Sequence, residues 1–297
     1  MKRKIIRVLS LSSIAFMLSG CLNLPFPNFG PSESTDTSNT STSEPTETSS
    51  SSTEQNNPDA DFVAEYYQSI SNDATGDDLL NQLNALNTSK RKRLITYAGF
   101  KDYFQYTERD PQGSTPADKM VGFYDNTLVH YLWDNQATWN REHVWPNSRG
   151  GGYVEDDILM PRPASVKINS ERGNMVYGTV NGSYDPGTYI AEYRGIAARI
   201  ILYCAIADKS LVLNESLEND GNNMGILSTL LKWNIEYPPE GYYSDKLALR
   251  VEWNRNYVNS VSQNMQGNRN PFVDHPEYAC RIWGSRDAKT KQACGLN

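Results

Sequence analysis

The chain has 297 residues, of which 38% are hydrophobic and 11% aromatic, and its formal net charge is −7 at pH 7. This composition can build a hydrophobic core, so it excludes a chain that is disordered throughout. The negative charge argues only weakly against a polyanionic partner. After residue 61 the chain has 24 basic and 28 acidic residues, a formal charge of 24 − 28 = −4. A domain this mildly acidic can still bind a phosphate locally.

The first 21 residues have the pattern of a bacterial lipoprotein signal peptide. Four basic residues lie among the first seven, and the apolar run Leu9 to Leu18 is too short to span a bilayer comfortably. The run ends at LSGC, so we expect cleavage before Cys21 and a lipid on Cys21 that anchors the protein to the outside of a membrane. The alternative is an ordinary secretory signal followed by a chance cysteine.

Residues 22–61 form the second predicted region. Ser, Thr, Glu, Asn and Pro dominate it, and it contains no Lys or Arg. Such a segment cannot bury enough apolar surface to offset its ordering entropy, so we expect a disordered linker. The folded domain is therefore predicted to comprise residues 62–297.

The first half of this domain shows helical and strand patterns in turn. Residues 62–86 have helical spacing, and two short strands flank the turn pair Asp125-Asn126 in MVGFYDNTLVHYLW. TWNREHVWP predicts a strand that leads into the glycine-rich loop NSRGGGYVEDD. PASVKINSERGN predicts a short helix, with Pro163 in its first turn and Gly173 at its C-terminal cap.

The second half is predicted to be mainly helical. Helices are expected in YRGIAARIILYCAIAD, GILSTLLKWNIEYPP and DKLALRVEWNRNYVNSVSQ, and QGNRNPFVDHPEYACRIW should be a fixed loop with a short helix. Cys204 lies in an apolar run and is expected to be a buried thiol. Cys280 and Cys294 are close enough in sequence to pair across a short loop, and the chain has no cysteine pattern typical of zinc.

One set of residues has the chemistry needed to hydrolyse a phosphodiester. Glu142 and His143 stand at a strand end, and Asn169 follows in the short helix after the glycine-rich loop. Hydrolysis needs a base for water and a cation against the developing negative charge. His143 can be that base, and the oxygen atoms of Glu142 and Asn169 suit Mg²⁺.

Three segments, NREHVWPNS, DILMPRPASVKINSERGN and QGNRNPFVDHPEYACRIW, resemble the bacterial endonuclease I family in letters, order and spacing. The resemblance covers roughly residues 80–284. It implies an α+β fold in which a ββα-metal (His-Me) finger with a small mixed sheet is surrounded by helices. It also implies a secreted, largely non-specific nuclease that acts on DNA and that could also act on RNA.

The resemblance implies a role for each matching residue. His143 matches the general base, and Glu142 and Asn169 match the protein ligands of Mg²⁺. Glu155 matches a supporting acidic residue, which we expect to be a further residue of the metal site. The implied products carry 5′-phosphate and 3′-hydroxyl ends.

The chain departs from the family pattern at one place. Members commonly carry a His-His or His-Asn pair where this chain has Leu159 and Met160, and Pro161 replaces a usual leucine. This departure keeps open a second interpretation, a weak or inactive surface module that binds nucleic acid or another surface partner.

Other polar residues near these motifs have competing interpretations. Arg149 and Arg172 are predicted to be catalytic residues that contact phosphate. The alternatives are a solvated Arg149 and an Arg172 that pairs with an acid such as Asp157. Arg141 is expected to pair with an acid. The remaining histidines, His130 and His275, are expected to belong to the core and to the scaffold, respectively.

Overall fold

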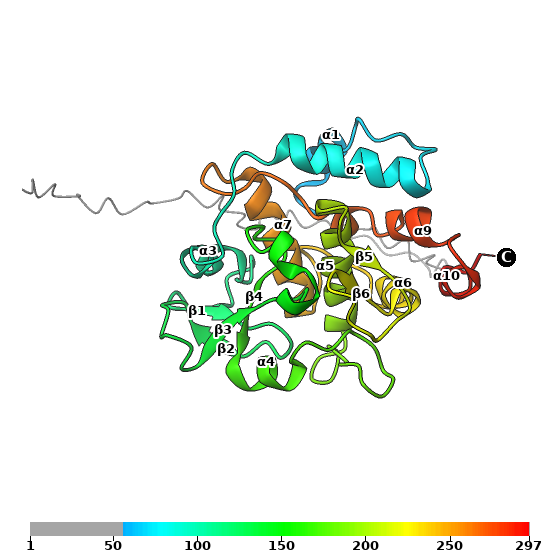
Figure 1. Ribbon diagram of the computed structural model, residues 1–297. Helices are drawn as coiled ribbons and strands as arrows, with labels where there is room; N and C mark the ends of the chain where they lie inside the picture. Colours follow the sequence, from blue (N-terminus) through cyan, green and yellow to red (C-terminus); the bar gives the residue numbers. More distant parts are fainter. Residues whose placement is uncertain (1–55, 297) are drawn as a thin grey trace, which may run out of the picture. The chain divides into compact units, whose positions relative to one another are not determined.

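The computed structural model describes residues 56–296. The predicted signal peptide, Cys21 and residues 22–55 of the predicted linker lie outside the described residues. Within the described range, ten α-helices and six short strands confirm the α+β class (Figure 1). No helix in this range is both long and apolar enough to cross a membrane.

The helices account for far more of the described chain than the strands do. Their bounds are α1 Ala60–Tyr66, α2 Gly76–Lys90, α3 Phe100–Thr107, α4 Val166–Arg172, α5 Tyr193–Ala207, α6 Leu227–Glu236, α7 Leu247–Val261, α8 Pro271–Asp274, α9 Tyr278–Trp283 and α10 Ala288–Ala293. Two 3₁₀ turns, η1 Asn147–Arg149 and η2 Gly151–Tyr153, lie in the glycine-rich loop. The predicted helix over residues 62–86 is therefore two helices, with residues 67–75 between them.

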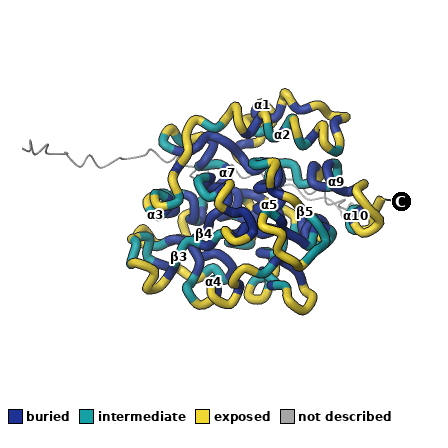
Figure 2. The backbone as a smooth tube through the Cα atoms, in the orientation of Figure 1, coloured by how far each residue is buried: buried dark blue, intermediate teal, exposed yellow. Residues whose placement is uncertain are grey.

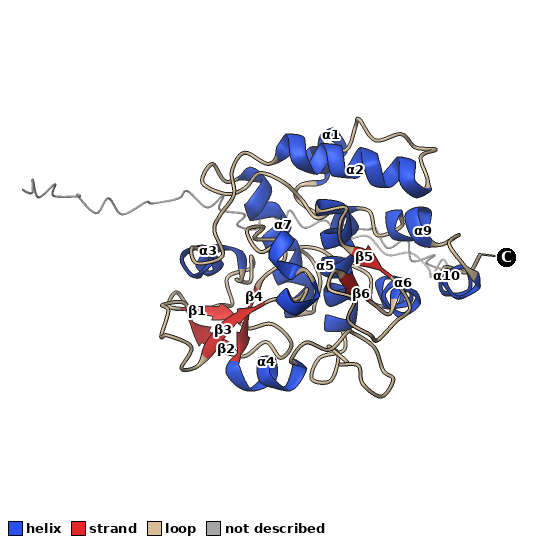
Figure 3. Cartoon of the chain, in the orientation of Figure 1, coloured by secondary structure: helices blue, strands red, loops and turns tan. Residues whose placement is uncertain are grey.

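The strands form three separate two-stranded sheets in the described range and not one small mixed sheet (Figure 3). Their bounds are β1 Lys119–Val121, β2 Leu128–His130, β3 Trp139–Glu142, β4 Arg162–Ser165, β5 Val212–Leu213 and β6 Asn223–Met224. The first two pairs are antiparallel and the third is parallel. A single bridge between Phe123 and Ala164 joins the first pair to the second.

The predicted helix start at Pro163 is wrong. Pro163 lies in β4 opposite Arg141. Proline has no N–H to donate, but its carbonyl oxygen accepts a hydrogen bond from Phe123 N at 2.7 Å. Helix α4 instead begins after Ser165, whose hydroxyl accepts from Ile168 N at 3.3 Å. Its predicted end at Gly173 is confirmed, and this glycine has φ 56°.

Helix α5 forms the centre of the core (Figure 2). Its apolar residues are buried, and it packs against α2, α6, α7 and α8. Its one fully buried arginine, Arg199, donates two hydrogen bonds of 2.7 Å to Glu252 of α7. The pair satisfies both charges inside the core.

The folded domain begins before the predicted boundary at residue 62. Asp59 precedes α1 and is buried. Its carboxylate accepts from Trp253 Nε1 at 2.9 Å and from Arg269 at 2.8 Å. Asn57 Oδ1 accepts from Tyr242 N at 2.7 Å. These contacts tie residues 57–59 to the C-terminal half, so the folded domain includes residues that were assigned to the linker.

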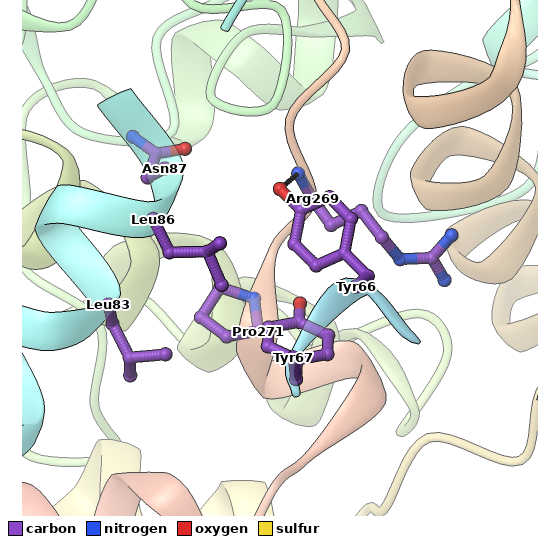
Figure 4. A pocket seen from close by; sticks show the side chains of 7 residues that line it. All are labelled: Tyr66, Tyr67, Leu83, Leu86, Asn87, Arg269 and Pro271. Carbon is purple, nitrogen blue, oxygen red and sulfur yellow. Dashed lines mark hydrogen bonds between the residues drawn. The ribbon is translucent and has the colours of Figure 1, made fainter. Parts of the chain in front are cut away.

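Residues 266–270 form a fixed loop that leads into the short helix α8, as predicted. Asn268 donates to Asn87 at 2.8 Å and to Tyr203 at 2.7 Å, so the loop is bonded to α2 and α5. Figure 4 shows a small hollow between this loop, α1 and α2, where Arg269 N donates to the Tyr66 hydroxyl at 3.1 Å. None of the predicted site residues lines this hollow.

Two predictions about the cysteines are resolved. Cys280 and Cys294 form a disulfide that ties α9 to the end of α10. Cys204 is free and buried, as expected.

Candidate functional site

The predicted site residues lie on a β-β-α unit made of β3, β4 and α4. Strands β3 and β4 are antiparallel, with Glu142 opposite Arg162 and Asn140 opposite Ala164. Helix α4 follows β4 directly and packs against both strands. Strand β3 ends at Glu142, so the backbone is free to turn at His143. Adjacent residues within a strand point to opposite faces, so Glu142 and His143 can act at one site only if the strand ends between them.

The Glu142 side chain is buried, with 2% of the residue's surface exposed. Its Oε1 accepts a hydrogen bond from the Tyr124 hydroxyl at 2.8 Å and lies 3.4 Å from Arg172 Nε. Burial raises the pKa of Glu142, while the Arg172 charge and the Tyr124 hydrogen bond act in the opposite direction. Among the described residues, no hydrogen bond involves Oε2 of this carboxylate.

Asn169 lies on α4 and faces the same strand. Its Nδ2 donates to Asn140 Oδ1 at 2.7 Å. Asn140 and Glu142 are two residues apart on β3 and therefore share a face, as Asn169 and Arg172 do on α4. The structure thus brings Glu142, Asn140 and Asn169 to one strand–helix interface.

This interface has the donor chemistry that a hard divalent cation needs. The Asn140 bond orients the Asn169 amide, leaving its Oδ1 without a hydrogen bond among residues 56–296. Together with Glu142 Oε2, this gives two oxygen donors, a set that fits Mg²⁺ because that ion usually keeps several waters. Within the described chain, no group of three or more His, Cys, Asp or Glu side chains is placed to hold a metal.

His143 has different neighbours from Glu142. Its ring packs against Tyr97, with centroids 4.4 Å apart, and its Nε2 lies 3.5 Å from Glu155 Oε2. Nε2 is buried and forms no hydrogen bond with any described residue. Burial lowers the pKa of His143 below its ordinary value of 6.5, Glu155 acts to raise it, and Arg172 and Arg141 add to the lowering. The open Nε2 of the ring is a nitrogen that can accept a proton.

Glu155 is not placed with the predicted metal ligands. It contacts His143, and Asn147 Nδ2 donates to it at 3.4 Å. Glu142, in contrast, is surrounded by Tyr124 and Arg172. These contacts place Glu155 beside the predicted base, and its predicted role as a metal ligand stays a prediction.

Arg172 does not reach out towards a phosphate. Only 1% of its surface is exposed. It donates to the carbonyl oxygens of His143 at 3.1 Å and Val144 at 2.6 Å, and its charge faces Glu142, not Asp157. Asp157 is occupied instead by Arg91 and Tyr203. Arg172 therefore holds the backbone carbonyls of the predicted base and of the residue after it.

The Arg149 side chain is also buried, and Nε, Nη1 and Nη2 of its guanidinium each donate a hydrogen bond. It donates to the carbonyl oxygens of Asn174, Leu217 and Glu218 at 2.8–2.9 Å. It is thus neither solvated nor directed at a phosphate, and it ties the glycine-rich loop to later loops. Arg141 was expected to pair with an acid, but it forms no ion pair among the described residues. Its guanidinium lies 4.1 Å from the centroid of the Tyr97 ring instead.

The two residues that depart from the family pattern are part of the core. Leu159 and Met160 are buried and pack in the main hydrophobic cluster. The polar pair expected there is therefore replaced by apolar packing.

Three residues of this site were missed by reasoning from the sequence. Asn140 orients Asn169, Tyr124 holds Glu142, and Tyr97 packs on His143. Strand alternation could have indicated Asn140, two positions before Glu142. No local signal could have indicated Tyr97 or Tyr124, because each comes from another element of the fold.

Comparison with known proteins agrees with the motifs. The model of the Endonuclease I family matches residues 68–277. An extracellular ribonuclease of Bacillus amyloliquefaciens is 30% identical over 256 residues, which cover 76% of this chain and 80% of that protein. An extracellular ribonuclease of Bacillus subtilis (strain 168) is 30% identical over 240 residues, covering 73% of this chain and 78% of that protein. No solved structure matches the chain significantly.

Proposed function

Since the chain belongs to the endonuclease I family and is a nuclease, we propose that it is an exported, metal-dependent endonuclease that cleaves DNA and RNA with little sequence preference. The observation that carries this proposal is the position of His143, whose Nε2 has no hydrogen-bond partner among the described residues, on a β-β-α unit that also carries Glu142 and Asn169. We interpret this unit as a ββα-metal finger.

His143 is the proposed general base. Its Nε2 accepts a proton from a water molecule whose oxygen then forms a bond to the scissile phosphorus. The ring becomes positively charged in this step, and Glu155, 3.5 Å away, then forms an ion pair with it. Tyr97 and the Arg172 bond to the His143 carbonyl hold the ring and its backbone in place.

Glu142 and Asn169 are the proposed ligands of Mg²⁺. The bound ion would supply positive charge against the scissile phosphate and the leaving oxygen. Tyr124 and Arg172 hold the Glu142 carboxylate, and Asn140 orients the Asn169 amide. The bond from phosphorus to the 3′ oxygen breaks, so the products carry 5′-phosphate and 3′-hydroxyl ends.

Both kinds of nucleic acid are proposed as substrates. Water, not the ribose 2′-hydroxyl, is the nucleophile in this scheme, so DNA is chemically competent. The two Bacillus relatives are named as ribonucleases, which supports RNA as a substrate. Little sequence preference is expected if contacts are mainly to sugar and phosphate.

The experiment that tests the proposal is cleavage by purified protein that lacks the first 21 residues. Supercoiled plasmid and labelled RNA are incubated with Mg²⁺ or with EDTA. His143→Ala is compared with His130→Ala, since the His130 side chain accepts from Leu132 N at 3.0 Å and lies 3.9 Å from Asp118, neither of which belongs to the proposed site. We expect EDTA to abolish cleavage, His143→Ala to slow it by about 10²–10⁴-fold, and His130→Ala to cleave normally.

Two further readouts check the chemistry. Cleaved duplex should be rejoined by DNA ligase without end repair, and RNA with 2′-O-methyl groups should still be cut. Undiminished cleavage by His143→Ala would refute the proposed base. If folded wild type cut nothing with any divalent metal, the weak or inactive surface module would replace this proposal.

Export with a lipid anchor on Cys21 is proposed for the location. The lipoprotein signal pattern supports it, and the extracellular relatives support export. Cys21→Ser should move the protein from the membrane fraction to the medium. Membrane retention of that variant would contradict the anchor.

A further inference from the structure

The connection between α2 and α3 runs past the proposed base. We call its residues Arg91–Tyr97 the strap. Three contacts fix it to the fold: Lys92 N donates to Gln266 O at 2.7 Å, Arg91 to Asp157 at 2.5 Å, and Tyr97 N to Asp156 Oδ1 at 2.8 Å. The strap is therefore held in one conformation and is not a loose loop.

One end of the strap touches the site. The Tyr97 ring packs on His143 at 4.4 Å between centroids, and its hydroxyl donates to Arg141 O at 2.8 Å. Arg141 also lies above the Trp133 ring at 5.1 Å. Any polymer whose phosphate is attacked beside His143 must pass close to this end.

The middle of the strap presents free positive charge. Lys90–Arg93 reads KRKR, and two of these charges are already engaged: Arg91 pairs with Asp157, and the Lys90 ammonium lies 5.1 Å from the Tyr66 ring. Lys92 and Arg93 are exposed, and neither side chain forms an ion pair or hydrogen bond with residues 56–296. The next residue, Leu94, is 57% exposed.

Chain length limits how far these charges lie from the base. Tyr97 is the fourth residue after Arg93, so their Cα atoms are at most about 14 Å apart. A duplex advances about 3.4 Å per nucleotide along each strand. Phosphates within about four nucleotides of the scissile one are therefore within reach of Lys92 and Arg93.

We propose that the strap binds the sugar-phosphate backbone of the nucleic-acid substrate beside the cleavage site. Lys92 and Arg93 contact phosphates, and Leu94 packs against a sugar or base. This inference rests on the proposed function, since it assigns the polymer that His143 acts on. It also explains how a domain with more acidic than basic residues holds a polyanion.

An anionic lipid surface is the competing partner for exposed basic residues. Polybasic lipid-binding segments typically use four to eight free Lys or Arg. Only two of the four charges in KRKR are free of partners among the described residues, and the strap continues directly into the contact with His143. The observations therefore favour nucleic acid.

The test compares two double variants of the full chain purified in detergent. Lys92→Gln/Arg93→Gln removes the free charges of the strap. Lys289→Gln/Lys291→Gln removes two exposed charges from α10, which Figure 1 shows well away from α3 and the α2–α3 connection. Binding of a labelled 24-nucleotide DNA or RNA is followed by fluorescence anisotropy in EDTA, from 50 to 200 mM salt.

We expect the strap variant to bind on the order of tenfold more weakly at low salt. The slope of log K against log salt should fall by about 1.4, since each single-strand phosphate contact contributes about 0.7. The α10 variant should match wild type. With Mg²⁺, the strap variant should show a raised KM for the 24-mer and an unchanged rate on bis(4-nitrophenyl) phosphate, which is too small to reach the strap.

Three outcomes would overturn the inference. The strap variant could bind like wild type, both double variants could lose binding equally, or the strap variant could lose binding only to anionic phosphatidylglycerol vesicles. Because binding is measured in EDTA, these results do not depend on catalysis. Failure of the proposed nuclease activity would instead appear as absence of cleavage by wild type.

Discussion

Two buried arginines show how single residues can mislead when only the sequence is known. Arg149 and Arg172 are close in sequence to the predicted base, and a guanidinium is a good phosphate ligand. In the structure both groups are directed inward, and each donates to carbonyl oxygens of nearby loops. Irregular backbone near a site needs buried donors, and arginine supplies several from one side chain.

Arg172 also compensates the charge of Glu142, and this makes a prediction about stability. Arg172→Met leaves a buried carboxylate without its cation and removes the Arg172 donor from three carbonyl oxygens. We expect the free energy of unfolding, measured by urea denaturation, to fall by about 3–5 kcal/mol. Lys167→Met, on the exposed side of the same helix, should change it by less than about 0.5 kcal/mol.

The double variant Glu142→Leu/Arg172→Met provides the internal control. Removing both charges avoids an unpaired buried ion, so the double variant should be more stable than Arg172→Met alone. Additive losses from the two single substitutions would show instead that the two charges are not coupled.

Among the elements, helices were the easiest to predict and short strands the hardest. The apolar run of α5 and the periodic apolar residues of α7 are properties of contiguous residues. Strand β4 contains Pro163 and has only four residues, and its identity depends on pairing with β3 some twenty residues earlier. The start of α4 was misplaced for the same reason, since a proline before a helical pattern normally marks the first turn.

Helix α10 is attached to the domain through a covalent link, which leads to a second stability prediction. The Cys280–Cys294 disulfide joins residues 14 apart, and a closed loop of this size restricts the unfolded chain by about 3 kcal/mol. Cys280→Ser/Cys294→Ser should therefore lower the free energy of unfolding by about 2–3 kcal/mol. Cleavage activity below the unfolding temperature should be unchanged, because the site contains no residue of α9 or α10.

Reductant gives a matched check on this prediction. Dithiothreitol should destabilise wild type by the same amount and leave the double serine variant unaffected. A wild type that is insensitive to reductant at its unfolding transition would argue against a structural role for the disulfide.

At the scale of the whole molecule, the sequence predicted the α+β class and which segments meet at the site. The motif residues Glu142, His143 and Asn169 do lie on one β-β-α unit. What it could not predict was the direction of each side chain: Glu155 faces His143 and not Glu142, and Tyr97 and Tyr124 enter from other elements. Such contacts depend on how distant segments pack, which no local pattern encodes.

The start of the domain was likewise set by a distant contact. Asp59 looks like linker in composition, yet it pairs with Arg269 more than two hundred residues later. Shortened forms of the protein should therefore begin upstream of Asn57, so that this pair is retained.

The proposed mechanism requires Glu142 and Asn169 to hold a metal while His143 acts as the base. The most direct test is the single-turnover cleavage rate of a labelled duplex as a function of Mg²⁺ concentration, for Glu142→Gln, Asn169→Ala and His143→Ala. We predict that the first two raise the half-saturating Mg²⁺ concentration by on the order of tenfold or more. His143→Ala should leave that concentration unchanged and lower the saturating rate by about 10²–10⁴-fold. Cleavage that needs no divalent metal, or three variants with the same Mg²⁺ dependence as wild type, would contradict these roles.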